Sequence, residues 1–200
     1  MRFSFKGFLY QLLADPSISR LHSSVLGHID STHRVLDVAC GTGSLSIAMA
    51  GRAKQVMGID LSEDMIITAQ RVARRKRIEN TLFELRDATD LSYFTDKQFD
   101  VAVTSMAVHQ FDALLAVKIL SEMGRIAHRV IIVDYNSFMP KGFYSSGAWT
   151  IERMAGGDHY RNFAVFMKRG GIRYFAAEAG LLLKSEATRG GGVFAVVICS

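Results

Sequence analysis

The chain has 200 residues, which suits one domain, or one domain with a small cap, and excludes two independent enzymes. Hydrophobic residues make up 49% and charged residues 22%, so the composition excludes bulk disorder and supplies a sizeable core. The net charge of +5 has a local source, because five positive side chains between Arg71 and Arg77 account for the whole excess.

The first 33 residues precede the regular pattern of the chain and are rich in aromatic residues. We predict a small N-terminal helical cap over residues 1–33. Phe3, Phe5, Phe8 and Tyr10 are candidates for a lid over a site, and Tyr10 is also a candidate substrate contact. Packing of the cap on the core would explain these aromatic residues equally well.

From Arg34 onward, short apolar runs alternate with longer amphipathic stretches, which is typical of strand and helix units around a parallel sheet. Several runs are continuously apolar, as expected when helices cover both faces of the sheet. We therefore predict an α/β sandwich with five parallel strands. The expected strands are Val35–Ala39, Gln55–Asp60, Thr81–Arg86, Phe99–Ser105 and Arg129–Asp134. The expected helices are Ser44–Arg52, Ser62–Arg77 and Asp112–Ala127, with Ser62 and Asp112 as N-caps.

The end of the chain differs from this repeat. The runs Leu181–Thr188 and Val193–Ser200 are separated by only four residues, and a link that short makes an antiparallel hairpin at one edge of the sheet. We expect a helix near Phe163–Ala179 before the hairpin. Residues 135–162, between the fifth strand and this helix, are the candidate substrate loop.

A glycine turn follows the first strand. Residues 35–44 read VLDVACGTGS, which places a buried strand directly before a turn and a helix start. Gly41 and Gly43 allow positive φ angles and leave room for a ligand against the main chain. The polar end of such a ligand can meet free helix N–H groups. The turn alone leaves the ligand open.

Two aspartates end the next two strands. Asp60 lies 17 residues after Gly43, so its carboxylate should stand beside the glycine turn and could accept hydrogen bonds from both ribose hydroxyls. A charge favoured near a helix N-terminus is the alternative for Asp60. Asp87 could accept from an adenine amino group, or it could simply form a turn. A nicotinamide cofactor is disfavoured because Ser46 stands where its fingerprint needs a third glycine, and no P-loop lysine follows the glycines.

Together these motifs resemble the class I S-adenosylmethionine-dependent methyltransferases. The likeness covers about residues 34–134, and it rests on the run Val35–Ala50, GIDLS at 58–62, RDA at 86–88 with Leu91, and FDVAV at 99–103. It implies a Rossmann-like doubly wound fold, a methyltransferase domain over residues 34–200, S-adenosylmethionine as cofactor and S-adenosylhomocysteine as product. More loosely, DYN at 134–136 and GGDHYRNF at 156–163 are similar to bacterial relatives of quinone-biosynthesis methyltransferases.

The resemblance also implies which residues hold the cofactor. Residues of the glycine turn would surround its methionine part, namely Asp37, Ala39, Cys40, Gly41 and Gly43. Asp60 would hold the ribose, and Leu61 and Met65 would flank the adenine. Asp87 and Ala88 would contact the adenine edge, and Ser105 and Met106 would lie near the sulfonium. Cys40 also fits the description of a small buried hydrophobic residue, because no base accompanies it.

His109 is the candidate catalytic residue. It follows the fourth strand in AVHQF at 107–111 and should face the methyl side of the cofactor. An ordinary pKa near 6.5 would let it act as a base, and substrate positioning is the alternative role. Further acceptor-side candidates are Tyr135, His159, Tyr160 and Arg161. No metal is expected, since His22, His28, His33 and His128 lack compact ligand spacing.

The sequence therefore predicts a methyltransferase that acts on a small molecule, with aromatic or quinone-like acceptors ahead of carboxylates and amines. RNA methylation is the alternative activity, since the basic run could contact phosphates. However, a helix that starts at Ser62 should carry Arg71–Arg77 to the edge of the sheet opposite the methyl group, where those charges complement the helix dipole. A non-catalytic binding or scaffold protein is the third hypothesis.

The sequence also predicts a cytoplasmic location without a membrane span. Its apolar runs, such as Val193–Cys199, are far shorter than the roughly 18 to 20 residues a span requires. Gln11 and Asp15 interrupt the N-terminal apolar stretch, and no cleavage pattern follows it. Two cysteines, Cys40 and Cys199, are too few for a disulfide framework. The sequence does not indicate an oligomeric state.

Overall fold

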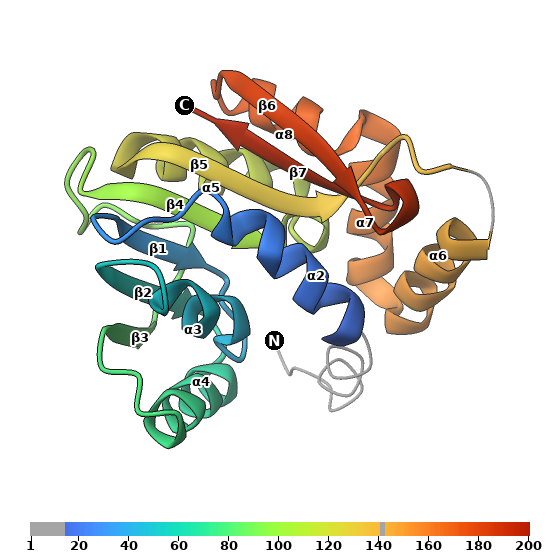
Figure 1. The fold of residues 1–200 in the computed structure, drawn as a ribbon. Coiled ribbons are helices and arrows are strands. Elements are labelled where there is room, and N and C mark those ends of the chain that lie inside the picture. Colours follow the sequence, from blue (N-terminus) through green and yellow to red (C-terminus); the bar gives the residue numbers. More distant parts are fainter. Residues whose placement is uncertain (1–14, 141–142) are drawn as a thin grey trace.

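The computed structural model describes residues 15–140 and 143–200. The lid candidates Phe3, Phe5, Phe8 and Tyr10 lie outside these residues. Seven strands form one sheet in the order β3-β2-β1-β4-β5-β7-β6 (Figure 1). The strands are β1 (Arg34–Val38), β2 (Gln55–Asp60), β3 (Thr81–Leu85), β4 (Phe99–Ser105), β5 (Ala127–Tyr135), β6 (Leu183–Arg189) and β7 (Phe194–Cys199).

The sheet reverses its strand order beside β1. β1 pairs in parallel with β2 on one side and with β4 on the other, so that Asp37 lies opposite Gly58 and Val103. The chain runs outward from β1 through β2 to β3 and then crosses back to β4. Ligands of open α/β sheets bind at such a switch point, outside the carboxyl ends of the strands.

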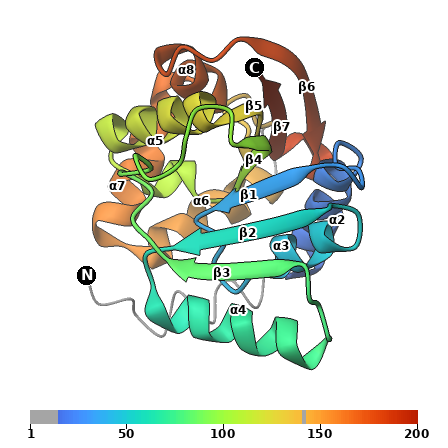
Figure 2. The ribbon, with the colours of Figure 1, turned by 90° about the vertical axis from the view of Figure 1, so that its left-hand side faces the viewer.

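Three helices cover one face of the sheet (Figures 1 and 2). They are α2 (Asp15–Leu26), α3 (Ser44–Ala50) and α4 (Glu63–Arg75). Val35, Val101 and Ile131 point to this side and pack with Val25 of α2 and Met49 of α3. This face follows from the two-residue period of the strands, which sends alternate side chains to opposite sides.

The other face is covered by α5 (Ala113–Ile126), α7 (Gly157–Arg169) and α8 (Gly171–Glu178) (Figure 2). The intervening strand residues Leu36, Ala102 and Ile132 point to this side and share a core with Ile119 of α5 and Phe175 of α8. α6 (Phe143–Ala155) lies next to α7, beyond the carboxyl end of β5 (Figure 1). None of the helices described is long and apolar enough to cross a membrane.

The predicted α/β architecture is confirmed, including the five parallel strands and the antiparallel C-terminal hairpin. The expected caps behave differently from each other. Asp112 caps α5 by accepting a hydrogen bond from the N–H of Leu114 at 3.0 Å. Ser62 occupies the N-cap position of α4, but its side chain makes no capping bond.

The segment before the hairpin departs from the prediction. The single helix expected over Phe163–Ala179 is wrong, because two helices meet there at Gly170 and Gly171. Both glycines have positive φ angles, +109° and +62°, which end α7 in a left-handed turn. The candidate substrate loop 135–162 contains α6 and the start of α7 and is therefore largely helical in the part described.

Candidate functional site

The glycine turn between β1 and α3 has the conformation that the sequence predicts. Gly41 and Gly43 have φ angles of 54° and 75°. A Cβ added to Gly43 would lie 2.8 Å from both Ala69 of α4 and the ring of Phe83 on β3. Position 43 therefore needs glycine both for its backbone conformation and for close packing beneath the turn.

Asp60 stands beside this turn at the end of β2. Its Oδ2 accepts a hydrogen bond from the N–H of Gly41 at 2.8 Å, and its Oδ1 accepts one from the N–H of Ser62 at 2.9 Å. Burial raises the pKa of Asp60, and the backbone N–H groups of Ser62, Gly41 and Leu61 partly offset that effect. An ionised carboxylate has about four acceptor positions, so this arrangement can still accept hydrogen bonds from two ligand hydroxyls.

Asp37 is buried behind the turn. It accepts a hydrogen bond from the hydroxyl of Ser46 at 2.5 Å, and Ser46 is fully buried in α3. Ser46 therefore has a structural role at the position where a nicotinamide fingerprint would have glycine. Burial raises the pKa of Asp37 to about 7, although the bond from Ser46 acts in the opposite direction.

Cys40 belongs to the glycine turn, and its N–H donates to the carbonyl of Ile59 on β2 at 3.0 Å. Burial raises the pKa of its thiol, and the carboxylates of Asp37 and Asp60 raise it further. The thiol is consequently neutral near pH 7 and poorly suited to nucleophilic chemistry. Cys40 is half-buried and packs against the core cluster that contains Phe83, so it is a packing residue but is less buried than the sequence predicts.

The expected adenine contacts lie along the same edge of the sheet. The N–H of Arg86 donates to the carbonyl of Asp60 at 3.0 Å, which brings the loop after β3 next to the end of β2. Met65 is buried in α4, whereas Leu61 is 67% exposed. Asp87 accepts from the N–H of Thr89 at 2.8 Å and so forms the turn that was its alternative role. Its contact with adenine stays a prediction, as does that of the half-buried Ala88.

The end of β4 forms the other side of the switch point. Ser105 is the last residue of β4, and Met106 follows it with a φ of 55°. The N–H of Met106 donates to the carbonyl of Val133 on β5 at 2.8 Å. Both side chains are half-buried, and their place near a sulfonium stays a prediction.

His109 belongs to a buried polar network. It lies in a 3-10 turn, η1 (Val108–Gln110), and is 1% exposed. Its Nδ1 lies 2.6 Å from Oδ1 of Asp134, and its backbone N–H donates to Oδ2 of the same carboxylate at 3.1 Å. Burial would lower the pKa of His109, but the Asp134 carboxylate outweighs burial and raises it.

Glu152 of α6 completes the network on the other side of the imidazole. Its Oε1 lies 3.7 Å from Nε2 of His109 and accepts a hydrogen bond from the hydroxyl of Tyr135 at 2.8 Å. Its Oε2 contacts Nε2 of His159 on α7. Burial would raise the pKa of Glu152, but the bond with His159 and the neighbouring imidazoles lower it.

The network unites some of the predicted acceptor-side residues and omits others. His109, Tyr135 and His159 come together, whereas Arg161 is 72% exposed and pairs with Asp158. Tyr160 is half-buried and packs against Trp149. The sequence reasoning missed two members. Asp134 carried a signal, because it ends the predicted strand Arg129–Asp134, but Glu152 lies in a segment without any motif.

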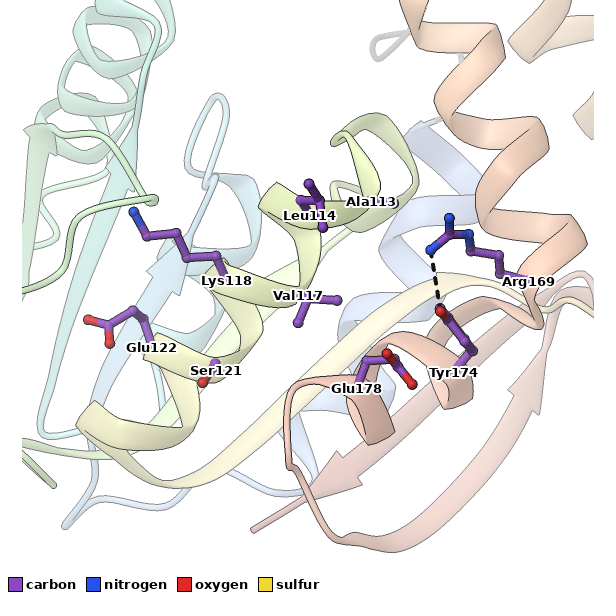
Figure 3. A pocket seen from close by; sticks show the side chains of 9 residues that line it. All are labelled: Ala113, Leu114, Val117, Lys118, Ser121, Glu122, Arg169, Tyr174 and Glu178. Atoms are coloured by element: carbon purple, nitrogen blue, oxygen red, sulfur yellow. Dashed lines mark hydrogen bonds between the residues drawn. The ribbon is translucent and has the colours of Figure 1, made fainter.

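A separate groove of about 400 Å³ lies between α5 and the helices α7 and α8 (Figure 3). Leu114, Lys118 and Glu122 line it from α5, and Tyr174 lines it from α8. The hydroxyl of Tyr174 accepts from Arg169 at 3.3 Å across one end. No residue of the glycine turn or of the Asp60 region lines the groove, so it is distinct from the candidate cofactor site.

Comparison with known proteins gives consistent results. A family model described as a methyltransferase domain matches residues 29–164. The 23S rRNA (uracil(1939)-C(5))-methyltransferase RlmD of Alcanivorax borkumensis is 28% identical over 159 residues, covering 70% of this chain and 33% of that protein. A demethylmenaquinone methyltransferase of Leptospira interrogans is 29% identical over 121 residues, covering 59% and 46%. This chain thus spans less than half the length of these two relatives.

Among solved structures, the magnesium protoporphyrin IX methyltransferase of Synechocystis PCC 6803 with bound SAH matches this chain with a TM-score of 0.67. The two sequences are 20% identical, and the match covers 100% of this chain and 88% of the other. At that identity the match shows the fold. The family model covers more than half of the chain, which therefore belongs, as its motifs predict, to the class I S-adenosylmethionine-dependent methyltransferases.

Proposed function

We propose that this chain binds S-adenosylmethionine, the cofactor expected of its family, and transfers the methyl group to a small-molecule acceptor. The proposal rests mainly on the carboxylate of Asp60, which stands 2.8 Å from the N–H of Gly41 at the switch point of the sheet. At this point a carboxylate that can hold the ribose hydroxyls lies beside a glycine turn. The main chain of that turn can contact the amino-acid part of the cofactor. The clash that any Cβ at Gly43 would cause is with Ala69 and Phe83, so this glycine lets the turn pack closely against α4 and β3.

The proposed reaction requires alignment more than proton transfer. When bound, the cofactor supplies a methyl group on a sulfonium, and that sulfonium leaves as a neutral thioether. The chain would hold the ribose through Asp60, fix the tail on the glycine turn and orient the acceptor from the ends of β4 and β5. Positioning of this kind contributes up to roughly 7 to 11 kcal/mol in favourable systems.

Aromatic side chains near the end of β5 support an aromatic or quinone-like acceptor. Trp149 of α6 packs edge-on against Phe163 of α7 with ring centroids 4.8 Å apart, and Tyr135 lies 5.1 Å from the same ring. Trp149 is partly exposed, at 37%, so it offers a face to an apolar ligand. The demethylmenaquinone and protoporphyrin methyltransferases among the similar proteins are consistent with a small, flat acceptor.

RNA is the second candidate acceptor, because one similar protein is an rRNA methyltransferase. The location of the positive charge argues against it. α4 starts beside Asp60 and runs back along the sheet, so Arg71–Arg77 lie at the end of the molecule opposite the glycine turn (Figure 2). Phosphate contacts made there would not bring a base to the methyl group.

The role of His109 as base stays a prediction. Its imidazole is almost fully buried and is faced by a carboxylate at each nitrogen, so little of its surface can touch an acceptor. This geometry counts against direct contact of His109 with the acceptor, either as a base or as a group that positions it. A base is needed only if the acceptor atom must lose a proton.

The central test is a titration of the protein with S-adenosylhomocysteine in which calorimetry measures the binding affinity. We expect saturable binding, weakened by about 1 to 3 kcal/mol in Asp60→Ala, because hydrogen bonds to a charged group are lost. Asp60→Asn keeps an oxygen for the backbone donors and should weaken binding less. Asp96→Ala, which removes an exposed acid far from the turn, should bind as the parent does.

Circular dichroism of each variant separates loss of binding from loss of fold. If the parent protein fails to bind S-adenosylhomocysteine, the proposed function is wrong. If the folded Asp60→Ala variant binds as tightly as the parent, Asp60 does not hold the ribose.

A further inference from the structure

We propose that His109, Glu152 and His159 form a binding site for one divalent transition-metal ion of the Zn²⁺ type. One nitrogen from each histidine and one oxygen of the glutamate all lie within 4.8 Å of one another. Two imidazoles and a carboxylate are ligands that Zn²⁺ prefers, and sets of three such protein ligands leave a fourth position open.

The hydrogen bonds of His109 prepare its outer nitrogen for a metal. The Asp134 carboxylate already accepts from the backbone N–H of His109, and an ionised carboxylate can only accept, so Nδ1 of the ring must carry a proton. In the neutral imidazole the lone pair is then on Nε2, the atom that faces Glu152. A carboxylate behind a ligating histidine is the usual arrangement that orients the ring and strengthens it as a ligand.

A cation would also suit the charge of the cluster. Asp134 and Glu152 are two carboxylates at 0% and 1% exposure. With neutral imidazoles, the lone pair of His109 Nε2 and the Oε1 of Glu152 face each other at 3.7 Å as two acceptors, which is unfavourable in a buried place. A divalent ion among the three ligands would balance both negative charges. Protonation of both imidazoles is the alternative way to balance these charges. The experiment below distinguishes a bound metal ion from two protonated imidazoles.

The surroundings of the cluster hold one ligand in place and leave another open to solvent. The hydroxyl of Tyr135 donates to Glu152 at 2.8 Å and fixes one of its oxygens. The side chain of His159 is 27% exposed, so the cluster can be reached from solvent on that side. The ion would join η1, α6 and α7, which aromatic packing and the hydrogen bond from Asn162 to the carbonyl of Gln110 already hold together.

This proposal goes beyond methyl transfer and departs from the expectation that no metal is bound. That expectation considered histidines close together in the sequence. His109 and His159 are separated by 50 residues, and Glu152 has no motif around it, so the group exists only in the folded chain.

The test uses the metal-free 200-residue chain, titrated with Zn²⁺ in competition with a chromophoric chelator. We expect one tightly bound equivalent in the parent protein and at least a tenfold loss of affinity in both Glu152→Gln and His159→Ala. The matched control is His128→Ala, which removes an exposed histidine on β5 and should leave the affinity unchanged. Titration with Co²⁺ should give the visible absorption of a four-coordinate site in the parent and not in Glu152→Gln.

Each outcome is decisive. Absence of a tight equivalent in the folded parent, or equal affinity in the parent, Glu152→Gln and His159→Ala, would overturn the metal site in favour of protonated imidazoles. His159→Ala changes a partly exposed side chain and carries the test should the buried Glu152→Gln variant not fold. Binding of S-adenosylhomocysteine by the same metal-free samples tests the proposed function separately.

Discussion

Asp37 couples the stability of this protein to pH through a single buried carboxyl. Its pKa is raised to about 7 by burial in the folded state, whereas an unfolded chain gives aspartate a pKa of about 3.9. Between these values the folded state keeps a proton that the unfolded state releases. Stability from this group is therefore fully present below about pH 4, falls as pH rises toward 7, and stays constant above that.

Asp37→Asn should remove this dependence. A neutral side chain of the same shape avoids the cost of ionising a buried group. The variant should therefore become more stable relative to the parent as pH rises. From pH 5 to pH 8 the difference in free energy of unfolding should grow by about 3 kcal/mol, at about 1.4 kcal/mol per pKa unit. Urea unfolding of the ligand-free proteins measures it.

The exposed Asp96 provides the control for that measurement. Asp96→Asn should show no comparable growth, because its side chain is 75% exposed and Asp37 is unchanged. A difference between Asp37→Asn and the parent that is constant with pH would show that Asp37 is ionised in the folded protein throughout.

The sequence predicted single residues where the local pattern specifies a place in space. Gly41 follows one predicted strand and Asp60 ends the next. Because parallel strands end at one edge of the sheet, their proximity could be predicted, although the hydrogen bond between them was not. Glu152 could not be found in this way. Its position opposite His109 depends on how α6 packs beyond β5, and no spacing along the chain encodes that packing.

At the scale of elements, α4 shows how charge follows helix position. Glu63 and Asp64 lie in its first turn, Arg74 and Arg75 in its last, and each pair complements the helix dipole at its own end. Met65, Ile66, Ala69 and Ala73 form the buried stripe between them. This pattern accounts for the basic run without a nucleic acid.

The triple change of Arg74, Arg75 and Arg77 to Ser should therefore leave the cofactor site intact. We expect affinity for S-adenosylhomocysteine within about twofold of the parent, and a loss of free energy of unfolding of about 1 kcal/mol or less from the helix end. An assay for transfer of a labelled methyl group to bulk RNA tests the alternative acceptor. If the parent methylates RNA and this variant does not, the acceptor is RNA and the small-molecule proposal fails.

Helix boundaries show the limit of prediction from sequence at this scale. α3, α4 and α5 were anticipated to within two residues, because each follows a strand and shows an amphipathic or polar pattern that differs from the strand before it. The break between α7 and α8 was missed. Gly170 and Gly171 are adjacent, and only the folded chain shows that both adopt positive φ and turn the helix axis there.

At the scale of the whole molecule, the strand order explains why the candidate site depends on the complete sheet. The sequence predicted the strands and their direction but not the order, because pairing of β1 with β4 joins segments more than 60 residues apart. The expected cofactor residues come from the ends of β1, β2, β3 and β4, which only this order brings together. A ligand held there would bind the folded chain and not the unfolded one.

Such binding should stabilise the whole fold by mass action. At a concentration 100 times its Kd, S-adenosylhomocysteine should add about 2.7 kcal/mol to the free energy of unfolding. For a domain of this size, that corresponds to a rise in Tm of roughly 5 to 10 °C in a thermal melt.

NAD at the same concentration should produce no shift, because Ser46 fills the place of the third glycine and is bonded to Asp37. The same dose of S-adenosylhomocysteine should shift Asp60→Ala less, since its Kd is larger. An equal shift with NAD would mean that the glycine turn and Asp60 accept any nucleotide cofactor, and the assignment to S-adenosylmethionine would have no support from the site.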